Sequence, residues 1–124
     1  MSTDFSGRWA WAEVNLGLVQ HNTAVIAGRV APAQVWTVVK ANAYGHGSVP
    51  VAQAALAAGA TGLCVAIVDE GVLLRRAGIT APILVLSEQP PEMADLLAEA
   101  GFSGFGFRET VADRSVVWAE KPRD

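Results

Sequence analysis

Cysteine, histidine and charge are scarce in this 124-residue chain, and each scarcity excludes a class of protein. The single cysteine, Cys64, cannot form an internal disulfide, and its place in an apolar run predicts a buried, inert thiol. The two histidines have no cysteine or carboxylate partner at metal-ligand spacing, so no metal site is expected. The net charge is −3 and the nine basic residues are scattered, whereas nucleic-acid binding needs clustered Lys and Arg. The sequence therefore excludes disulfide frameworks, Cys/His metal proteins and nucleic-acid binders.

The chain also lacks formal charge between Lys40 and Asp69, which raises the question of a membrane span. A span needs about twenty strongly apolar residues, and this stretch is instead rich in alanine, glycine and small polar residues. A buried helix followed by a buried strand explains it better, so no membrane span is expected. Residues 1–7 have neither a basic start nor an apolar signal core, which predicts a cytoplasmic protein.

What the sequence does contain is an alternation of short β-branched runs with helical patterns. Helices are expected at 15–30, 48–58, 69–76 and 92–100, and strands at 34–39, 63–68 and 83–86, with 104–107 as a doubtful fourth strand. The near-continuous apolar strands suggest burial on both faces, as in a parallel sheet. This order indicates an α/β fold of parallel β/α units.

The extent of the domain follows from the number of units. A closed (β/α)8 barrel takes about 250 residues, so three clear units and a doubtful fourth would form the first half of such a TIM-type barrel. An open doubly wound sheet has the same pattern, and the pattern does not separate the two. We expect residues 1–124 to form a single partial domain, with 102–124 as an uncertain, divergent tail.

The most informative segment is Val38–Gly47, with the sequence VVKANAYGHG. Lys40 ends an apolar strand, and active sites of α/β folds lie at the carboxyl ends of strands. A partly desolvated amine there can attack a carbonyl to form a Schiff base, and pyridoxal phosphate (PLP) is the common cofactor that uses one. Position alone favours a structural alternative, in which Lys40 simply reaches solvent from a strand end.

The loop after Lys40 carries further polar groups. Gly45 and Gly47 allow positive φ and a close backbone approach, and Ser48 can cap a helix whose N-terminus could bind an anion. Tyr44 offers a phenol donor. A glycine-rich turn whose aromatic side chain packs on the fold is an equally good interpretation, and His46 is best explained as a hydrogen-bonded structural residue.

The ten residues of Val38–Gly47 resemble the PLP-lysine signature of alanine racemases. The opening segment Trp9–Leu16 (WAWAEVNL) is similar to that of the family, and segments 66–70 (AIVDE) and 81–86 (APILVL) resemble its second and third barrel strands. The similarity covers Trp9 to about Gly101. It implies an N-terminal (β/α)8 barrel that is followed, in the family, by a C-terminal β domain.

The resemblance also implies roles for individual residues. Lys40 would hold PLP and would be the base that moves the α-proton on one face of the substrate. Tyr44 would hydrogen-bond the cofactor phosphate, and Val38 and Leu86 would pack near the cofactor ring. The implied protein is an isomerase that interconverts L- and D-alanine, supplies D-alanine for peptidoglycan, and acts as a homodimer.

The chain departs from the family in what it does not include. The later barrel strands, with most phosphate contacts, and the tyrosine that serves as second base in the family do not occur in these residues. The expectation is therefore an N-terminal fragment of an alanine racemase, inactive by itself. The alternative is a non-catalytic PLP-binding module, or one that a partner completes.

Overall fold

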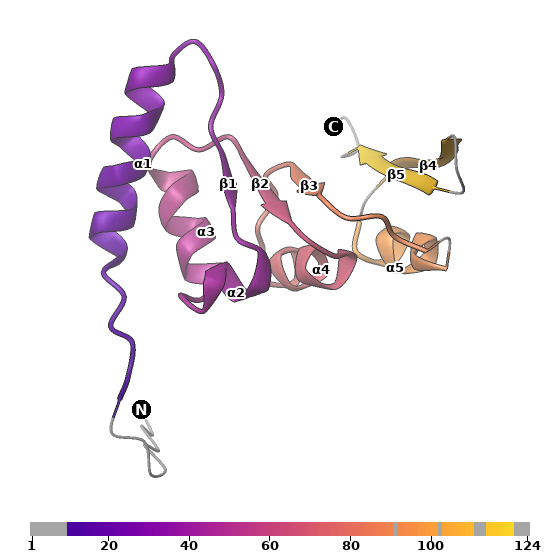
Figure 1. Cartoon of the computed structure of the whole chain (residues 1–124), viewed down its shortest axis with the longest axis horizontal. Coiled ribbons are helices and arrows are strands. Elements are labelled where there is room, and N and C mark those ends of the chain that lie inside the picture. Colours follow the sequence, from indigo (N-terminus) through magenta and orange to yellow (C-terminus); the bar gives the residue numbers. More distant parts are fainter. Residues whose placement is uncertain (1–9, 91, 102, 111–113, 121–124) are drawn as a thin grey trace.

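A computed structural model describes residues 10–90, 92–101, 103–110 and 114–120, and for the last two ranges the backbone only. Three strands, β1 (Trp36–Val38), β2 (Gly62–Val65) and β3 (Ile83–Val85), form one sheet in the order β1-β2-β3. All pairs are parallel, and the register places Val38 beside Cys64 and Cys64 beside Leu84. Helices alternate with these strands along the chain (Figure 1). The predicted α/β class with parallel β/α units is confirmed.

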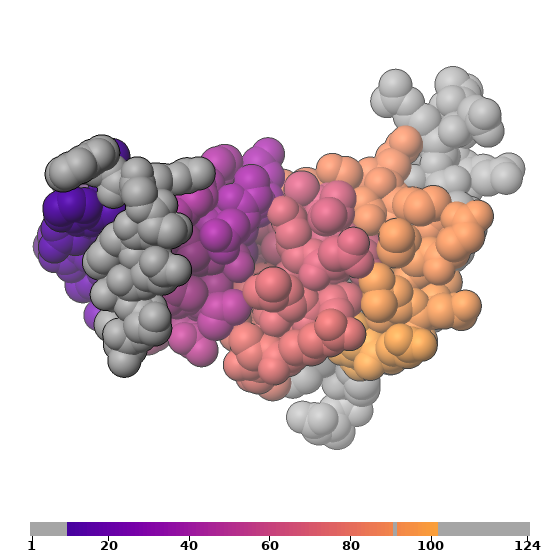
Figure 2. Space-filling model, turned by 90° about the horizontal axis from the view of Figure 1, so that it is seen from below, coloured from indigo at the N-terminus to yellow at the C-terminus, as the bar shows by residue number. Residues whose placement is uncertain are grey.

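The helices that follow β1 and β2 bury one face of this sheet. These are α3 (Ser48–Ala57) and α4 (Val68–Arg76). The core between helices and sheet is aliphatic, and its buried members are Val39, Ala43, Val51, Ala52, Leu63, Val65, Leu74 and Ile79. A smaller cluster of Val68, Val72 and Leu97 joins α4 to α5 (Met93–Glu99). Each unit thus packs against its neighbours in chain order, as Figure 2 also shows from the side of α2 and α4.

The other face of the sheet is open in the described part of the chain. Its side chains include Trp36, Val38 and Leu84, which are 38%, 37% and 49% exposed. All four positions of β2 are buried, but β1 and β3 are only half-buried or exposed. The expectation that every strand is buried on both faces was therefore wrong for β1 and β3, because helices cover only one face of the sheet. The aromatic ring of Trp36 lies over Gly62, whose lack of a side chain makes room for it.

Helix α1 (Leu16–Val30) lies beside α3 at one end of the molecule (Figure 1). The side chain of Asn15 accepts a hydrogen bond from the Leu18 N–H at 3.1 Å, so the predicted N-cap is confirmed. Thr23, buried against the fold, donates its hydroxyl to the Val19 carbonyl at 2.8 Å. The remaining face of α1 is exposed and includes apolar residues such as Ile26.

Two side chains fix α4 at its two ends. Gln89, buried in the loop after β3, accepts a hydrogen bond from the Val68 N–H at 3.1 Å and so satisfies a donor at the start of the helix. Arg75, in the last turn, donates to the carbonyls of Ile79 and Ala81 at 2.9 and 2.8 Å. Arg75 is thus half-buried and fastens the connection to β3. Its neighbour Arg76, in the same last turn, is exposed.

The doubtful fourth strand is present but belongs to a different sheet. Residues 104–107 lie in β4 (Ser103–Thr110), which pairs antiparallel with β5 (Arg114–Glu120). Only residues 111–113 separate the two strands, and such a short connection suits a hairpin, whereas a parallel neighbour needs a crossover of a dozen or more residues. The parallel sheet described here therefore holds three strands of a barrel. The second strand of the hairpin was not predicted.

Small differences separate the other predicted boundaries from the observed ones. Helix α4 begins at Val68, so β2 ends at Val65 instead of continuing to residue 68. Ser48 was expected to cap α3, but Gly47 occupies the cap and Ser48 is the first helical residue. No described helix is long and apolar enough to cross a membrane.

Candidate active site

The carboxyl edge of the parallel sheet gathers all four predicted site residues. Val38 is the last residue of β1, and Lys40 follows two positions later. Leu86 follows β3, where its N–H donates to the Val65 carbonyl at 2.8 Å. Tyr44 ends α2 (Lys40–Tyr44), the short segment that leaves β1. Lys40 is half-buried, whereas Tyr44 and Leu86 are 60% and 50% exposed. Residues that carry an amine, a phenol and apolar side chains therefore lie along the same edge of the sheet.

The segment α2 is a turn of left-handed helix. Ala41, Asn42 and Ala43 have φ values of 50°, 55° and 52°, with ψ between 43° and 48°, and Tyr44 has a φ of 54°. A left-handed conformation costs an L-residue roughly 1–2 kcal/mol because Cβ crowds the following carbonyl oxygen. Four such residues in succession are strained, and strained backbone persists only where surrounding contacts hold it, often at functional sites. The expected positive φ at Gly45 and Gly47 is confirmed at 88° and 93°.

Hydrogen bonds within the loop hold this turn. The Asn42 side chain accepts from the Ser48 N–H at 2.9 Å, and the Asn42 carbonyl accepts from the N–H groups of Gly45 and Gly47. Nδ1 of His46 lies 2.9 Å from the Ala43 carbonyl oxygen, where it can donate a hydrogen bond. His46 is therefore a structural residue of the loop, which agrees with the interpretation made from the sequence.

A side chain from the next β/α unit also contacts the turn. Oε1 of Glu70 accepts a hydrogen bond from the Ala41 N–H at 2.7 Å, and its Oε2 accepts from Ala66 at 2.7 Å and from Ile67 at 3.3 Å. Burial of the carboxyl raises the pKa of Glu70, but these three hydrogen bonds and the nearby charge of Lys40 outweigh that effect. The pKa of Glu70 therefore lies below its usual range, and the carboxylate is anionic at neutral pH.

The sequence predicted only that Glu70 lies at the start of a helix, within residues 69–76, so this contact was missed. The residue is indeed in the first turn of α4. Its link to Ala41, 29 residues earlier, depends on the parallel pairing of β1 with β2, which brings both strand ends to one edge. The one signal in the sequence was that residues 66–70 resemble a family segment.

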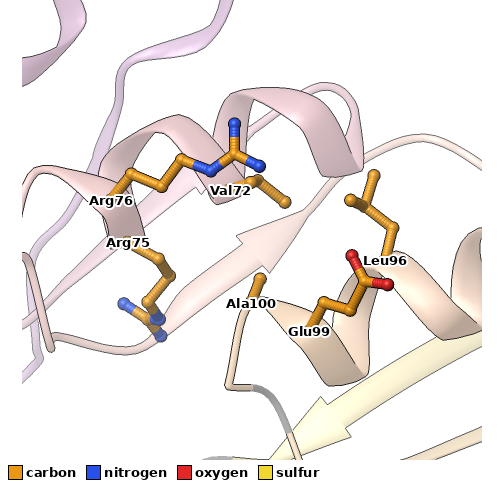
Figure 3. Close-up of a pocket in the computed structure, with 6 residues that line it drawn as sticks. All are labelled: Val72, Arg75, Arg76, Leu96, Glu99 and Ala100. Atoms are coloured by element: carbon orange, nitrogen blue, oxygen red, sulfur yellow. The ribbon is translucent and has the colours of Figure 1, made fainter.

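A buried thiol and a cavity lie outside this site. Cys64 is buried, as predicted, and burial raises the pKa of its thiol. A cavity of about 290 Å³ lies between the last turn of α4 and α5, lined by Val72, Arg75, Arg76, Leu96, Glu99 and Ala100 (Figure 3). The two guanidinium groups point in different directions there, and Arg75 is bonded to backbone carbonyls. This cavity is at the opposite end of α4 from Glu70, and it is explained by helix packing. No group of three metal-ligating side chains occurs among residues 10–90 and 92–101.

A parallel sheet of β/α units defines an α/β domain, and domains of this class carry their sites on the loops after the strands. Residues 14–114 match the family described as alanine racemase, N-terminal domain, and the chain belongs to that family.

Individual relatives agree with this assignment. Over 73% of its length, the chain is 50% identical to the alanine racemase of Carboxydothermus hydrogenoformans. The crystal structure of alanine racemase from Bacillus anthracis with bound L-Ala-P matches 73% of the chain with a TM-score of 0.70 and 50% identity. A histidine racemase from Leuconostoc mesenteroides matches 68% with a TM-score of 0.63 and 38% identity. The chain spans about a quarter of the length of these relatives, at 24%, 24% and 23%.

Proposed function

We propose that this chain is the cofactor-lysine part of a PLP-dependent alanine racemase, with Lys40 as the lysine that holds the cofactor. The observation that carries the proposal is the half-buried residue Lys40 at the carboxyl edge of the sheet, at the start of a strained turn that other residues hold in place. Strain at this position is costly for the fold alone, and a functional lysine gives a reason for it.

The side chains at the edge fit PLP by their chemistry. A primary amine at Lys40 suits its aldehyde, and the exposed phenol of Tyr44 can donate to its phosphate. Val38 and Leu86 can pack against an aromatic ring. A Cβ added at Gly45 would meet nothing within 4 Å, so the backbone there is open to approach. These four side chains and the glycine loop would hold one side of the cofactor.

Racemisation requires proton transfer at both faces of the substrate α-carbon. PLP, when bound, supplies an electron sink for the negative charge left by the departing proton. The Lys40 amine would accept or return the proton on one face, and such a positioned group contributes roughly 10²–10⁴-fold. Tyr44 is the only tyrosine of the chain and is assigned to the phosphate. The proton on the opposite face must then be handled by a group outside these residues, which we propose comes from a second subunit of a homodimer.

Alanine is the proposed substrate because the relatives with high identity are alanine racemases. The similarity to a histidine racemase supports amino acid racemisation in general more strongly than it supports alanine as the particular substrate. The proposal extends to D-alanine supply for peptidoglycan in the cytoplasm, as the family resemblance implies.

A second candidate function is a PLP-binding module without turnover that a partner chain completes. The open sheet face favours it, because Trp36, Val38 and Leu84 are left exposed within the described part of the chain. The two candidates share the role of Lys40 and differ in whether these residues act within one complete enzyme.

Borohydride reduction in the presence of PLP tests the shared role. The chain has two lysines, Lys40 and Lys121, so peptide mass spectrometry can assign the label. We expect pyridoxyl on Lys40 and its loss in Lys40→Ala. A label found mainly on Lys121, or one that survives Lys40→Ala, contradicts the assignment.

Activity tests the racemase chemistry that both candidates share. With excess PLP and L-alanine, the 124-residue chain should form no D-alanine above the Lys40→Ala background, because only one face of the α-carbon has a proton-transfer group. Supplying the remaining part of a related racemase as a second chain should restore Lys40-dependent turnover. Turnover by the isolated chain near that of a complete racemase would show that both groups lie within these residues.

A further inference from the structure

Glu70 gathers three backbone N–H groups from two separate places in the chain. One comes from Ala41, the residue after Lys40, and two come from Ala66 and Ile67, in the link between β2 and α4. Hydrogen bonds to an ionised carboxylate are about twice as strong as neutral ones. The carboxylate therefore joins the start of the left-handed turn to the end of the neighbouring strand.

The site has a specific need for such a link. Ala41 is the first of the four left-handed residues, so its backbone sets the direction in which the chain leaves Lys40. The bonds of Asn42 and His46 hold the far part of the loop, from Ala43 to Ser48. The near part is held by the backbone bond from the Ala43 N–H to the Val39 carbonyl and by Glu70, which reaches it from the next β/α unit. That unit is itself fixed by Gln89 and the core.

We propose that Glu70 is a positioning residue for Lys40, whose carboxylate fixes the strained turn after the lysine against β2 and α4. This role for a cofactor lysine rests on the function proposed above, whereas the contact itself does not. Glu70 acts through the backbone of Ala41, and its negative charge also lies close enough to Lys40 to interact with it electrostatically.

The chemistry of three converging donors explains why the residue is a glutamate. A glutamine of the same shape would offer one oxygen, and its NH2 group would face at least one of the N–H donors. Asp69 is the adjacent carboxylate in the same helical turn, but it is exposed. Asp69→Asn therefore removes the same charge from α4 without touching the turn, and it is the matched control for Glu70→Gln.

Hydrogen exchange followed at peptide level tests the contact without any cofactor. In Glu70→Gln, protection of the amides in 41–47 should fall about tenfold or more, the scale of losing a hydrogen bond to a charged group. Protection in α1 should stay the same, and Asp69→Asn should match the wild-type chain. If Glu70→Gln fails to fold, the wild-type chain decides the question, because a wild-type peptide of residues 41–47 that exchanges as fast as an unstructured one overturns the proposal.

PLP trapping tests the consequence for the lysine. At a temperature where circular dichroism shows each variant folded, the ratio of pyridoxyl on Lys40 to that on Lys121 should fall about tenfold in Glu70→Gln. Asp69→Asn should leave the ratio unchanged. A purely structural role for Glu70 would lower stability but leave the labelling ratio of the folded chain unaltered, and that result would overturn the proposal. An equal fall of the ratio in Asp69→Asn would also overturn it. A wild-type chain without label on Lys40 overturns the proposed function instead, while the exchange experiment still decides the contact.

Discussion

At the scale of single residues, the contact between Trp36 and Gly62 fixes how β1 and β2 meet on the open face of the sheet. A Cβ at Gly62 would lie 2.4–2.7 Å from three atoms of the indole ring, closer than real contacts allow. We predict that Gly62→Ala lowers the free energy of unfolding by about 1–3 kcal/mol, the usual cost of overpacking. Urea denaturation measures the change.

Gly28 provides the control for that substitution. It lies inside α1, and a Cβ there would meet nothing within 4 Å. Gly28→Ala should raise the free energy of unfolding by about 0.5–1 kcal/mol, because alanine is the better helix former. If Gly62→Ala does not lower the free energy of unfolding relative to Gly28→Ala, the Trp36 ring moves away from the added methyl group without cost.

Glu70 gives the molecule a predictable response to acid. Its folded-state pKa lies below the usual range, whereas in the unfolded chain it returns to about 4.3. Its stabilisation is therefore complete above about pH 5 and is lost as the pH falls through the lowered folded-state value. We predict that Glu70→Gln makes the free energy of unfolding less dependent on pH between about 5 and 3 than it is in the wild-type chain. A pH series of urea melts, with Asp69→Asn as the comparison, measures this, and identical slopes for wild type and Glu70→Gln would contradict it.

Single residues also show what the sequence could and could not predict. Lys40 was predicted as the cofactor lysine because the ten-residue string around it resembles a family signature, whereas its position at a strand end alone favoured a structural alternative. Glu70 was missed because its contact spans 29 residues, and only the parallel pairing of β1 and β2 makes the two strand ends neighbours. The positive φ of Gly45 and Gly47 was predictable from glycine, but that of Ala41 and Ala43 was not, because alanine has no preference for it.

At the scale of elements, the left-handed turn α2 is a place where substitution by glycine should not destabilise the fold as it does in an ordinary helix. Ala41 is exposed with φ 50°, so glycine would relieve a steric cost of roughly 1–2 kcal/mol there. Its extra freedom in the unfolded chain costs only about 0.5–1 kcal/mol. We predict that Ala41→Gly leaves the free energy of unfolding unchanged or raises it by up to about 1 kcal/mol.

The control is an alanine in an ordinary helix. Ala24 is exposed in the interior of α1, where glycine should lower the free energy of unfolding by about 0.5–1 kcal/mol. Thermal or urea melts of both variants give the comparison. A loss of stability in Ala41→Gly as large as in Ala24→Gly would show that the turn carries no strain.

The positions of helices and strands were predictable where the local sequence pattern determines them. They were less predictable where the pairing between distant strands determines the structure. The periodic apolar positions and the Asn15 cap located α1, and short β-branched runs located β1 and β3. The pattern in 104–107 indicated a strand but not its partner, since an antiparallel hairpin and a parallel crossover place similar residues in the strand. Burial on both faces was overestimated for the same reason, because apolar strands do not reveal what covers them.

At the scale of the whole molecule, the open sheet face and the strand edges dominate behaviour. Within the described residues, β1 and β3 each pair on one side only, and Leu84 lies exposed in the middle of β3. Unpaired edges beside an apolar face promote association. We predict that the 124-residue chain sediments as associated species, and that Leu84→Glu shifts it towards the monomer.

Leu73 is the control for this experiment. It is 50% exposed on α4, against 49% for Leu84 on the sheet, so the two leucines are matched in exposure. Leu73→Glu should leave the association unchanged in analytical ultracentrifugation. If the wild-type chain is a monomer with a sharp cooperative melt, the open sheet face does not drive association, and the prediction is wrong.

The link from Glu70 to Ala41 has a consequence for biosynthesis. Ribosomes add about 5–20 residues per second, so the 29 residues between the two partners take roughly 1.5–6 s to make. During that interval Lys40 already exists, but the carboxylate that holds its turn does not. The turn can therefore have its full set of contacts only after the second unit has been translated and has paired beside the first.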